Sequence, residues 1–131
     1  RNAIHAAAGQ STLSPEVREV LTAARGLVGV PYRYGGTSRQ TGVDCSGMLN
    51  LAFQEALGVT LPRRAVDLSK LGTPVRREQL QPGDLVFFGS PIHHVGMYIG
   101  GGMMVEAPHT GAQVHTSTIY RGGLVGAARV P

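Results

Sequence analysis

The sequence predicts an α+β domain in which N-terminal helices pack on a C-terminal antiparallel meander sheet. Helical periodicity occupies the first half of the 131-residue chain and short β-type runs the second, without the alternation of a parallel sheet. Nineteen glycines and eight prolines, spread along the chain, indicate many tight turns. The length suits one domain with its own core and is too short for two. We expect residues 1–13 to be a lead-in or tail and residues 14–131 to form the domain.

Caps and helical spacing mark three helices. Ser14-Pro15-Glu16 combines an N-cap, a first-turn proline and an early acid, and the run Gly29-Val30-Pro31 ends the helix that follows. After a polar loop, a second helix is expected over residues 44–57, with Gly58 as its C-terminal stop. A short third helix is expected over residues 64–71. These helices account for the N-terminal half of the domain.

Strands follow in the second half. The turn Pro82-Gly83-Asp84 precedes an apolar run that suits a buried strand, and a glycine triplet separates the next two runs. The last two runs are weaker. The expected strands cover residues 85–88, 94–99, 103–107, 114–117 and 125–130.

The hairpin around the glycine triplet decides which side chains share a face. With Gly100 at the centre of a three-residue loop, His94 lies directly opposite Glu106, with Cβ atoms about 4.5–5.5 Å apart. A two-residue turn would move Glu106 to the other face. We predict a three-residue or bulged turn, because glycine tolerates the positive φ that such turns need.

The chain's only cysteine, Cys45, begins the second predicted helix. A thiol reacts as thiolate, and a helix N-terminus favours negative charge. His94 supplies a base and Glu106 a carboxylate that can orient it, in the chain order Cys, His, Glu. The pattern predicts the chemistry of a cysteine peptidase. The alternatives are that Cys45 is a buried small hydrophobe and Glu106 a solvated surface acid.

Two adjacent histidines compete for the base position. Neighbouring residues of a strand point to opposite faces, so only one of His93 and His94 can meet Cys45. The hairpin register selects His94 and leaves His93 at the rim of the site. Tyr34 and Tyr98 are expected to be packing residues.

Composition excludes several functional classes. Twelve Lys and Arg against eight Asp and Glu give a net charge of +4. The pairs Arg63-Arg64 and Arg76-Arg77 lack interleaved aromatics, so no nucleic-acid partner is expected. The charge suits solubility or a polyanionic neighbour equally well. No apolar run approaches the roughly 20 residues that span a bilayer, so no membrane partner is expected.

The sequence carries no pattern typical of a metal site, a cofactor site or an export signal. His5, His109 and His115 lack ligand spacing to Cys or acids, so neither a metal nor another cofactor is expected. One cysteine leaves no internal disulfide. The chain does not open with the charged and apolar regions of a signal peptide, so we expect any such segment to precede residue 1.

Five motifs in order give the chain a resemblance to the NlpC family of cell-wall endopeptidases, covering about residues 17–130. Each motif is weak alone, and their order and spacing carry the resemblance. They are Pro31-Tyr32-Arg33-Tyr34-Gly35-Gly36, Asp44-Cys45-Ser46-Gly47, Leu61-Pro62-Arg63, Pro82-Gly83-Asp84-Leu85-Val86-Phe87-Phe88 and His94-Val95-Gly96-Met97-Tyr98-Ile99-Gly100.

The resemblance implies a papain-like fold and hydrolysis of peptidoglycan stem peptides, most often between D-glutamate and a diamino acid. Tyr32 matches a family tyrosine that lines the cleft, and Asp44 and Ser46 match positions that shape the substrate pocket. The backbone N–H of Cys45 and the side chain of Tyr32 are candidate oxyanion donors. Arg63 is left between two roles, pairing with an acid or meeting substrate carboxylates.

Two positions depart from the usual family pattern. The third catalytic position is commonly histidine and is Glu106 here, which resembles the subgroup of resuscitation-promoting-factor-interacting endopeptidases. A carboxylate can also hold the imidazole. Ala65 and Leu68 replace residues that are often Ser and Gln.

The expected function is that of a secreted or periplasmic endopeptidase, monomeric and acting on peptidoglycan through a thioester intermediate. Competing possibilities are a non-catalytic wall-binding domain, a lysin delivered by a phage or toxin system, and an acyl transferase using the same thiol intermediate. The intact Cys45, His94 and Glu106 argue against the binding domain. Product analysis distinguishes hydrolysis from transfer.

Overall fold

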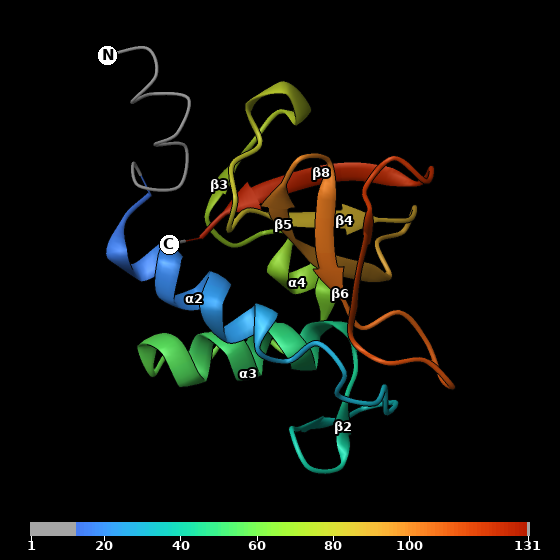
Figure 1. Cartoon of the computed structure of the whole chain (residues 1–131). Coiled ribbons are helices and arrows are strands. Elements are labelled where there is room, and N and C mark those ends of the chain that lie inside the picture. The colour runs from blue at the N-terminus through green and yellow to red at the C-terminus, as the bar shows by residue number, and fades with distance from the viewer. Residues whose placement is uncertain (1–12, 131) are drawn as a thin grey trace.

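Two helices pair beneath an antiparallel sheet in the computed structural model, which describes residues 13–130 (Figure 1). The predicted lead-in lies outside the described residues except for Leu13, whose side chain is buried in the core. No helix in the described part of the chain has the length and apolar character needed to cross a membrane. The helical elements are α2 (Pro15–Arg25), α3 (Cys45–Leu57), α4 (Ala65–Leu68) and the 3-10 helix η1 (Arg77–Gln79).

Helix α2 begins where the sequence predicts and ends earlier than predicted. Ser14 is its N-cap, and the Ser14 Oγ accepts a hydrogen bond of 3.2 Å from the N–H of Val17. The helix stops at Arg25 because the next residues leave it to pair with a distant segment. The N–H of Gly29 donates to the carbonyl of Val114 at 2.9 Å, and the N–H of Val114 donates to Val30 at 2.8 Å.

Helix α3 has the predicted bounds, and α4 is shorter than predicted. Asp44 caps the start of α3, and Gly58 ends it in the left-handed region at φ 67°. Helix α4 ends at Leu68, three residues early. The Ser69 hydroxyl donates to the carbonyl of Val66 at 2.5 Å and so competes with the helical pattern.

The sheet combines the predicted meander with a returning strand. Strands β4 to β7 are sequential antiparallel neighbours. Strand β8 returns to pair with the free edge of β4, and β3 pairs with the outer edge of β8, so the order is β3-β8-β4-β5-β6-β7. The short strands β1 to β3 were not predicted. The strands are β1 (Thr37–Ser38), β2 (Gly42–Val43), β3 (Thr73–Pro74), β4 (Leu85–Phe88), β5 (His94–Gly100), β6 (Met103–Glu106), β7 (His115–Thr118) and β8 (Leu124–Arg129).

The β5–β6 hairpin confirms the predicted shared face and contradicts the predicted pairing. Met97 pairs with Val105 and Tyr98 with Met104, so continuing this register places His94 two residues away from the position opposite Glu106. The turn has two residues, and a register shift between Tyr98 and Gly100 adds one more to β5. The extra residue restores the parity that a two-residue turn alone would lose. His94 and Glu106 therefore meet diagonally.

Each face of the sheet carries its own apolar cluster. The larger cluster packs α2 and α3 against the face that includes Phe87, Val95 and Val105. The smaller one occupies the opposite face and contains Val86, Phe88, Met104 and Ile119. By strand alternation His94 and Glu106 belong to this second face. His94 opens β5, so the end of the sheet meets the N-terminal end of α3.

Candidate active site

Cys45 is the first residue of α3, and its position follows from how that helix starts. The Asp44 Oδ1 accepts a hydrogen bond of 2.7 Å from the N–H of Gly47. A Cβ at Gly47 would overlap the carbonyl oxygen of Gly36, so only glycine allows the first turn to lie this close to the preceding loop. The half-buried thiol is thus held at a helix end whose N–H groups and dipole favour negative charge.

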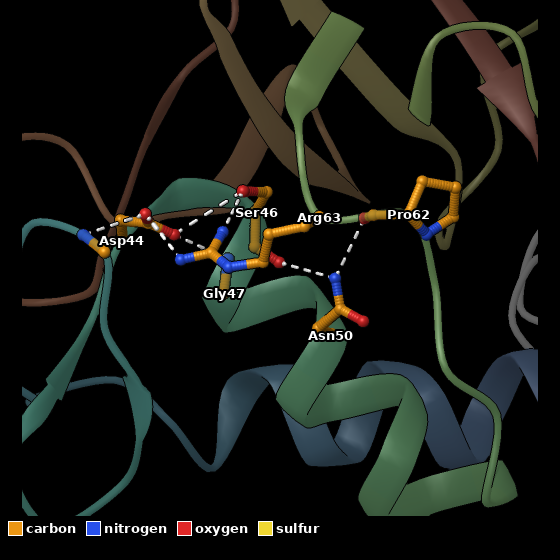
Figure 2. A network of polar contacts seen from close by, with 7 residues as sticks. Asp44, Ser46, Gly47, Asn50, Pro62 and Arg63 are labelled. Atoms are coloured by element: carbon orange, nitrogen blue, oxygen red, sulfur yellow. Dashed lines mark hydrogen bonds and ion pairs between the residues drawn. The ribbon is translucent and has the colours of Figure 1, made fainter. Parts of the chain in front are cut away.

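Asp44 does more than cap the helix, because its second oxygen joins the loop to Arg63 (Figure 2). The Oδ2 accepts hydrogen bonds from the N–H of Gly35 at 3.1 Å and from Arg63 Nη2 at 2.8 Å. Arg63 Nη1 donates to the Ser46 Oγ at 2.6 Å. The hydrogen bond that Arg63 donates to Asp44 raises the pKa of Arg63, which therefore stays charged. Of its two predicted roles, Arg63 fills the pairing role here.

Asn50 holds the segment that carries Arg63, and it was not predicted as a site residue. Its Nδ2 donates to the carbonyl of Pro62 at 3.0 Å, as Figure 2 shows, and its Oδ1 accepts from the N–H of Leu61 at 2.9 Å. Asparagine is a poor helix former, so its place inside α3 was the available signal. The side chain satisfies backbone groups of an extended segment and fixes Arg63 above Ser46.

Cavities open on both sides of Cys45. One of about 510 Å³ is lined by Cys45 and His94 together with Tyr32, Phe88, Gly89, His93, Pro108, His109, Arg121, Gly122 and Gly123. The other, of about 500 Å³, is lined by Cys45 together with Tyr32, Tyr34, Gly35, Asp44, Ser46, Arg63, Arg64, Ala65, Val66, Ile92 and His93. We call them the His94 cavity and the Arg63 cavity. The two cavities share Tyr32, Cys45 and His93 as lining residues, so they meet at the thiol.

The prediction that Tyr34 is a packing residue is wrong. Its side chain is 88% exposed at the rim of the Arg63 cavity, in a turn closed by the hydrogen bond from the N–H of Gly36 to the carbonyl of Arg33. Tyr98 is half-buried against the smaller cluster, and its hydroxyl accepts from the N–H of Gly102 at 3.1 Å. The two tyrosines therefore differ in role.

His94 is buried and lies between Cys45 and Glu106. Its Nε2 is 2.7 Å from the Glu106 Oε1, so Nδ1 is the ring nitrogen that remains available to the neighbouring Cys45. Burial lowers the pKa of His94, but hydrogen bonds and negative charge from Cys45 and Glu106 outweigh it and raise the pKa to about 9. His93 lines both cavities with an exposed side chain, as predicted for a rim residue.

Glu106 is fully buried, and four side chains satisfy its carboxylate. Its Oε1 accepts from His94 and from Arg121 Nη2 at 2.6 Å. Its Oε2 accepts from Arg121 Nη1 at 2.7 Å, Ser117 Oγ at 2.6 Å and His115 Nε2 at 2.8 Å. Burial raises the pKa of Glu106, but these hydrogen bonds lower it well below its usual range. The carboxylate is therefore ionised although it is buried. Glu106 is not the solvated surface acid of the alternative interpretation.

Arg121, His115 and Ser117 were not predicted as site residues. His115 pairs with Glu106 across β6 and β7, and Ser117 lies two residues further along the same face. The sequence indicates that His115 and Ser117 share one face of a strand. It does not indicate that this strand pairs with the one that carries Glu106. Arg121 comes from the segment between β7 and β8 and had no local signal.

Tyr32 stands beside the thiol on the wall shared by both cavities. Burial raises the pKa of its phenol, and the negative charges of Cys45 and Asp44 raise it further. The hydroxyl thus stays protonated and able to donate. Among the backbone hydrogen bonds of the described residues none uses the N–H of Cys45, so this group is also free to donate into the cleft.

His109 and His115, two of the three histidines without ligand spacing, contact groups of the protein. The His115 ring binds Glu106, and the His109 Nδ1 lies 3.0 Å from the carbonyl oxygen of Thr110. His5 lies outside the described residues. Within residues 13–130 no group of three side chains is arranged to hold a metal ion.

Comparison with known proteins identifies similar sequences and structures. The model of the NlpC/P60 family matches residues 29–126. The murein DD-endopeptidase MepH of Escherichia coli is 36% identical over 113 residues, which cover 79% of this chain and 42% of MepH. The gamma-D-glutamyl-L-lysine dipeptidyl-peptidase of Bacillus subtilis is 42% identical over 103 residues, covering 72% of this chain and 34% of that protein. The chain thus spans less than half the length of these two relatives.

Solved structures share the fold. The peptidoglycan hydrolase RipB of Mycobacterium tuberculosis superposes with a TM-score of 0.80 at 30% identity, covering 94% of this chain and 71% of RipB. The match extends over both the helices and the sheet, since it covers nearly the whole chain.

Proposed function

The chain belongs to the NlpC/P60 family, and from this premise we propose that it is a cysteine endopeptidase that hydrolyses stem-peptide bonds of bacterial peptidoglycan. The bond we assign is the one between D-glutamate and the following diamino acid. The observation that carries the proposal is the placement of Cys45 at the start of α3, beside His94 and the buried Glu106, where two cavities meet.

The thiolate of Cys45 attacks the scissile carbonyl carbon in the first step. The C–N bond breaks, the proton held by His94 passes to the leaving amine, and a thioester remains on the sulfur. Water then attacks the thioester and gives a proton to His94. The acyl group leaves as a carboxylic acid and the thiolate–imidazolium pair is restored.

Glu106 keeps His94 in the form that this sequence of steps needs. An ionised carboxylate only accepts hydrogen bonds, so Nε2 must carry a proton and Nδ1 remains available to Cys45. The negative charge of Glu106 also stabilises the imidazolium that stands beside the thiolate. Glu106 thus holds the tautomer and the charge of His94 without exchanging a proton itself.

Two groups that line both cavities can stabilise the charge that develops on the carbonyl oxygen. The N–H of Cys45 at the helix start is one donor and the protonated Tyr32 hydroxyl is the second. Neither donor has to change its protonation state for the reaction.

The two cavities give the substrate a direction. His94 must protonate the leaving nitrogen, so the diamino acid occupies the His94 cavity. The acyl part then lies in the Arg63 cavity, where Arg64 adds a positive charge beside the Arg63–Asp44 ion pair. D-Glutamate joined through its side chain keeps a free carboxylate, and this cavity suits such a group.

A second candidate bond comes from the relative MepH, which is named a DD-endopeptidase. A cross-link between D-amino acids would place D-alanine in the Arg63 cavity, and D-alanine offers no second carboxylate to Arg63 and Arg64. The charge of the cavity therefore favours the D-glutamyl bond.

We also propose that residues 14–131 act as one monomeric domain at the bacterial wall, outside the cytoplasm. Its partner is the peptidoglycan stem peptide, and the net charge of +4 suits that anionic polymer. Neither nucleic acid nor a membrane takes part in the proposed reaction.

Digestion of defined muropeptides tests the proposal. The protein should release the diamino acid portion with a new free amine, seen by mass spectrometry, and Cys45→Ala should release none. Cleavage at the D-alanyl cross-link alone would move the assignment to the second candidate. Equal cleavage by Cys45→Ala would refute the cysteine mechanism.

A further inference from the structure

The guanidinium of Arg121 holds the buried carboxylate of Glu106, and the reaction steps proposed above give Arg121 no role, although it also lines the His94 cavity. Arg121 makes a two-point contact with Glu106, Nη2 to Oε1 at 2.6 Å and Nη1 to Oε2 at 2.7 Å. The planar fork of arginine matches a carboxylate in only a narrow range of orientations. The contact therefore sets the plane of the Glu106 carboxylate.

Arg121 and His94 share one oxygen atom. The Glu106 Oε1 accepts from Arg121 Nη2 and, at 2.7 Å, from His94 Nε2. A shift of the guanidinium thus moves the very atom on which the imidazole rests. Ser117 and His115 bind only Oε2, so they make no contact with the oxygen that holds the imidazole.

Ring contacts through Phe88 also link Arg121 to His94. The Arg121 guanidinium lies 5.0 Å from the ring centre of Phe88, and the rings of Phe88 and His94 are 5.7 Å apart. Arg121 and Phe88 thus have cation–π geometry, and Phe88 and His94 pack as an aromatic pair. Phe88 and Glu106 therefore connect Arg121 to His94 by two routes.

From these contacts we propose that Arg121 is a positioning residue, which fixes the orientation of Glu106 and through it the orientation of His94 toward Cys45. The inference rests on the proposed function and goes beyond it, because it adds a residue that acts through Glu106. The groups facing Glu106 are His94 on β5, His115 and Ser117 on β7, and Arg121 on the segment between β7 and β8. Arg121 is the only one of these that contacts both oxygens.

Kinetics of Arg121→Gln and Arg121→Lys test the proposal, with Arg18→Gln on the outer side of α2 as the matched control. Misplacing a catalytic group by a fraction of an ångström costs on the order of 10- to 100-fold in rate, so kcat of Arg121→Gln should fall by about that factor with KM within about twofold. Arg121→Lys keeps the charge and one contact, and should recover part of the loss. Wild-type kcat in Arg121→Gln, or no recovery in Arg121→Lys, would overturn it.

A double-mutant cycle shows whether Arg121 acts through Glu106. In a Glu106→Gln background, Arg121→Gln should cost less than about threefold, because the oxygen it positions no longer holds the imidazole in the same way. If the two losses multiply in full, Arg121 acts independently of Glu106 and the proposal is wrong.

Alkylation of Cys45 separates this inference from the proposed function. Cys45 is the only cysteine, so its reaction with iodoacetamide at about pH 6 reports the thiolate–imidazolium pair without any substrate. Arg121→Gln should react more slowly than wild type, and Arg18→Gln at the wild-type rate. An unchanged rate in Arg121→Gln would overturn the inference even if stem peptides are cleaved. A slower rate in a protein that cleaves no stem peptide would support it and refute the proposed function.

Discussion

Replacing Glu106 by Gln tests how the charge of this residue controls His94. The pKa of His94 is raised from 6.5 to about 9, so the imidazolium is fully formed at neutral pH and is lost as pH rises through about 9. Activity should follow the same alkaline limb, because the thiolate needs its imidazolium partner. The Gln side chain keeps the size of Glu106 but loses its negative charge.

The size of the effect follows from the distance between the two groups. An opposite charge at hydrogen-bond distance shifts a pKa by about 1–3 units, so its loss should move the alkaline limb down by about 1.5 units, to about pH 7.5. That shift equals about 2 kcal/mol of lost imidazolium stabilisation. At about pH 8.5 the charged fraction of His94 then falls about eightfold, whereas at about pH 6 it hardly changes.

The assay is the pH profile of kcat/KM on a stem peptide, with the alkylation rate of Cys45 as a second readout. The exposed Glu78→Gln serves as the control, since Glu78 pairs only with Arg76 at the surface. A Glu106→Gln profile that keeps its alkaline limb at about pH 9 while losing rate uniformly would refute the reasoning.

Three further predictions follow from the contacts of single side chains. His94→Ala should lose about 10²- to 10⁴-fold in kcat, whereas His93→Ala should stay within about tenfold, and similar losses in both would contradict the choice of base. Arg63→Gln breaks a half-exposed ion pair, so the free energy of unfolding should drop by at most about 1 kcal/mol while KM rises, and a loss confined to kcat would contradict its place in the acyl cavity. Asp84→Asn removes the buried carboxylate that binds the partly exposed Arg129 at 2.8 and 2.9 Å, and urea unfolding should show a loss of about 1–2 kcal/mol. A loss below about 1 kcal/mol would show that this pair does not hold β8 to the start of β4.

Local chemistry allowed much of the fold to be predicted from the sequence. Ser14, Asp44 and Gly58 act through groups within a few residues, so the two helix starts and the end of α3 lie where their caps indicate. The end of α2 was missed because Val114, far along the chain, captures the residues that follow Arg25. A helix end that depends on hydrogen bonds to a distant segment cannot be predicted from the neighbouring residues.

The candidate site shows the same division. Cys45, His94 and Glu106 were found from residue type, order and strand parity. The pairing of the hairpin was missed by two residues because the extra residue near Ile99 depends on how β5 bends. Arg121 is fifteen residues from Glu106 in the sequence and in no common element, so its two-point contact could be seen only in the folded chain.

Intact-protein mass spectrometry during turnover tests the central claim most directly. A reaction on the proposed stem peptide, quenched in acid after milliseconds, should show an adduct with the mass of the acyl part bound to Cys45, and the adduct should disappear as substrate is consumed. An absence of adduct under turnover at every quench time, together with cleavage by Cys45→Ala, would contradict the account.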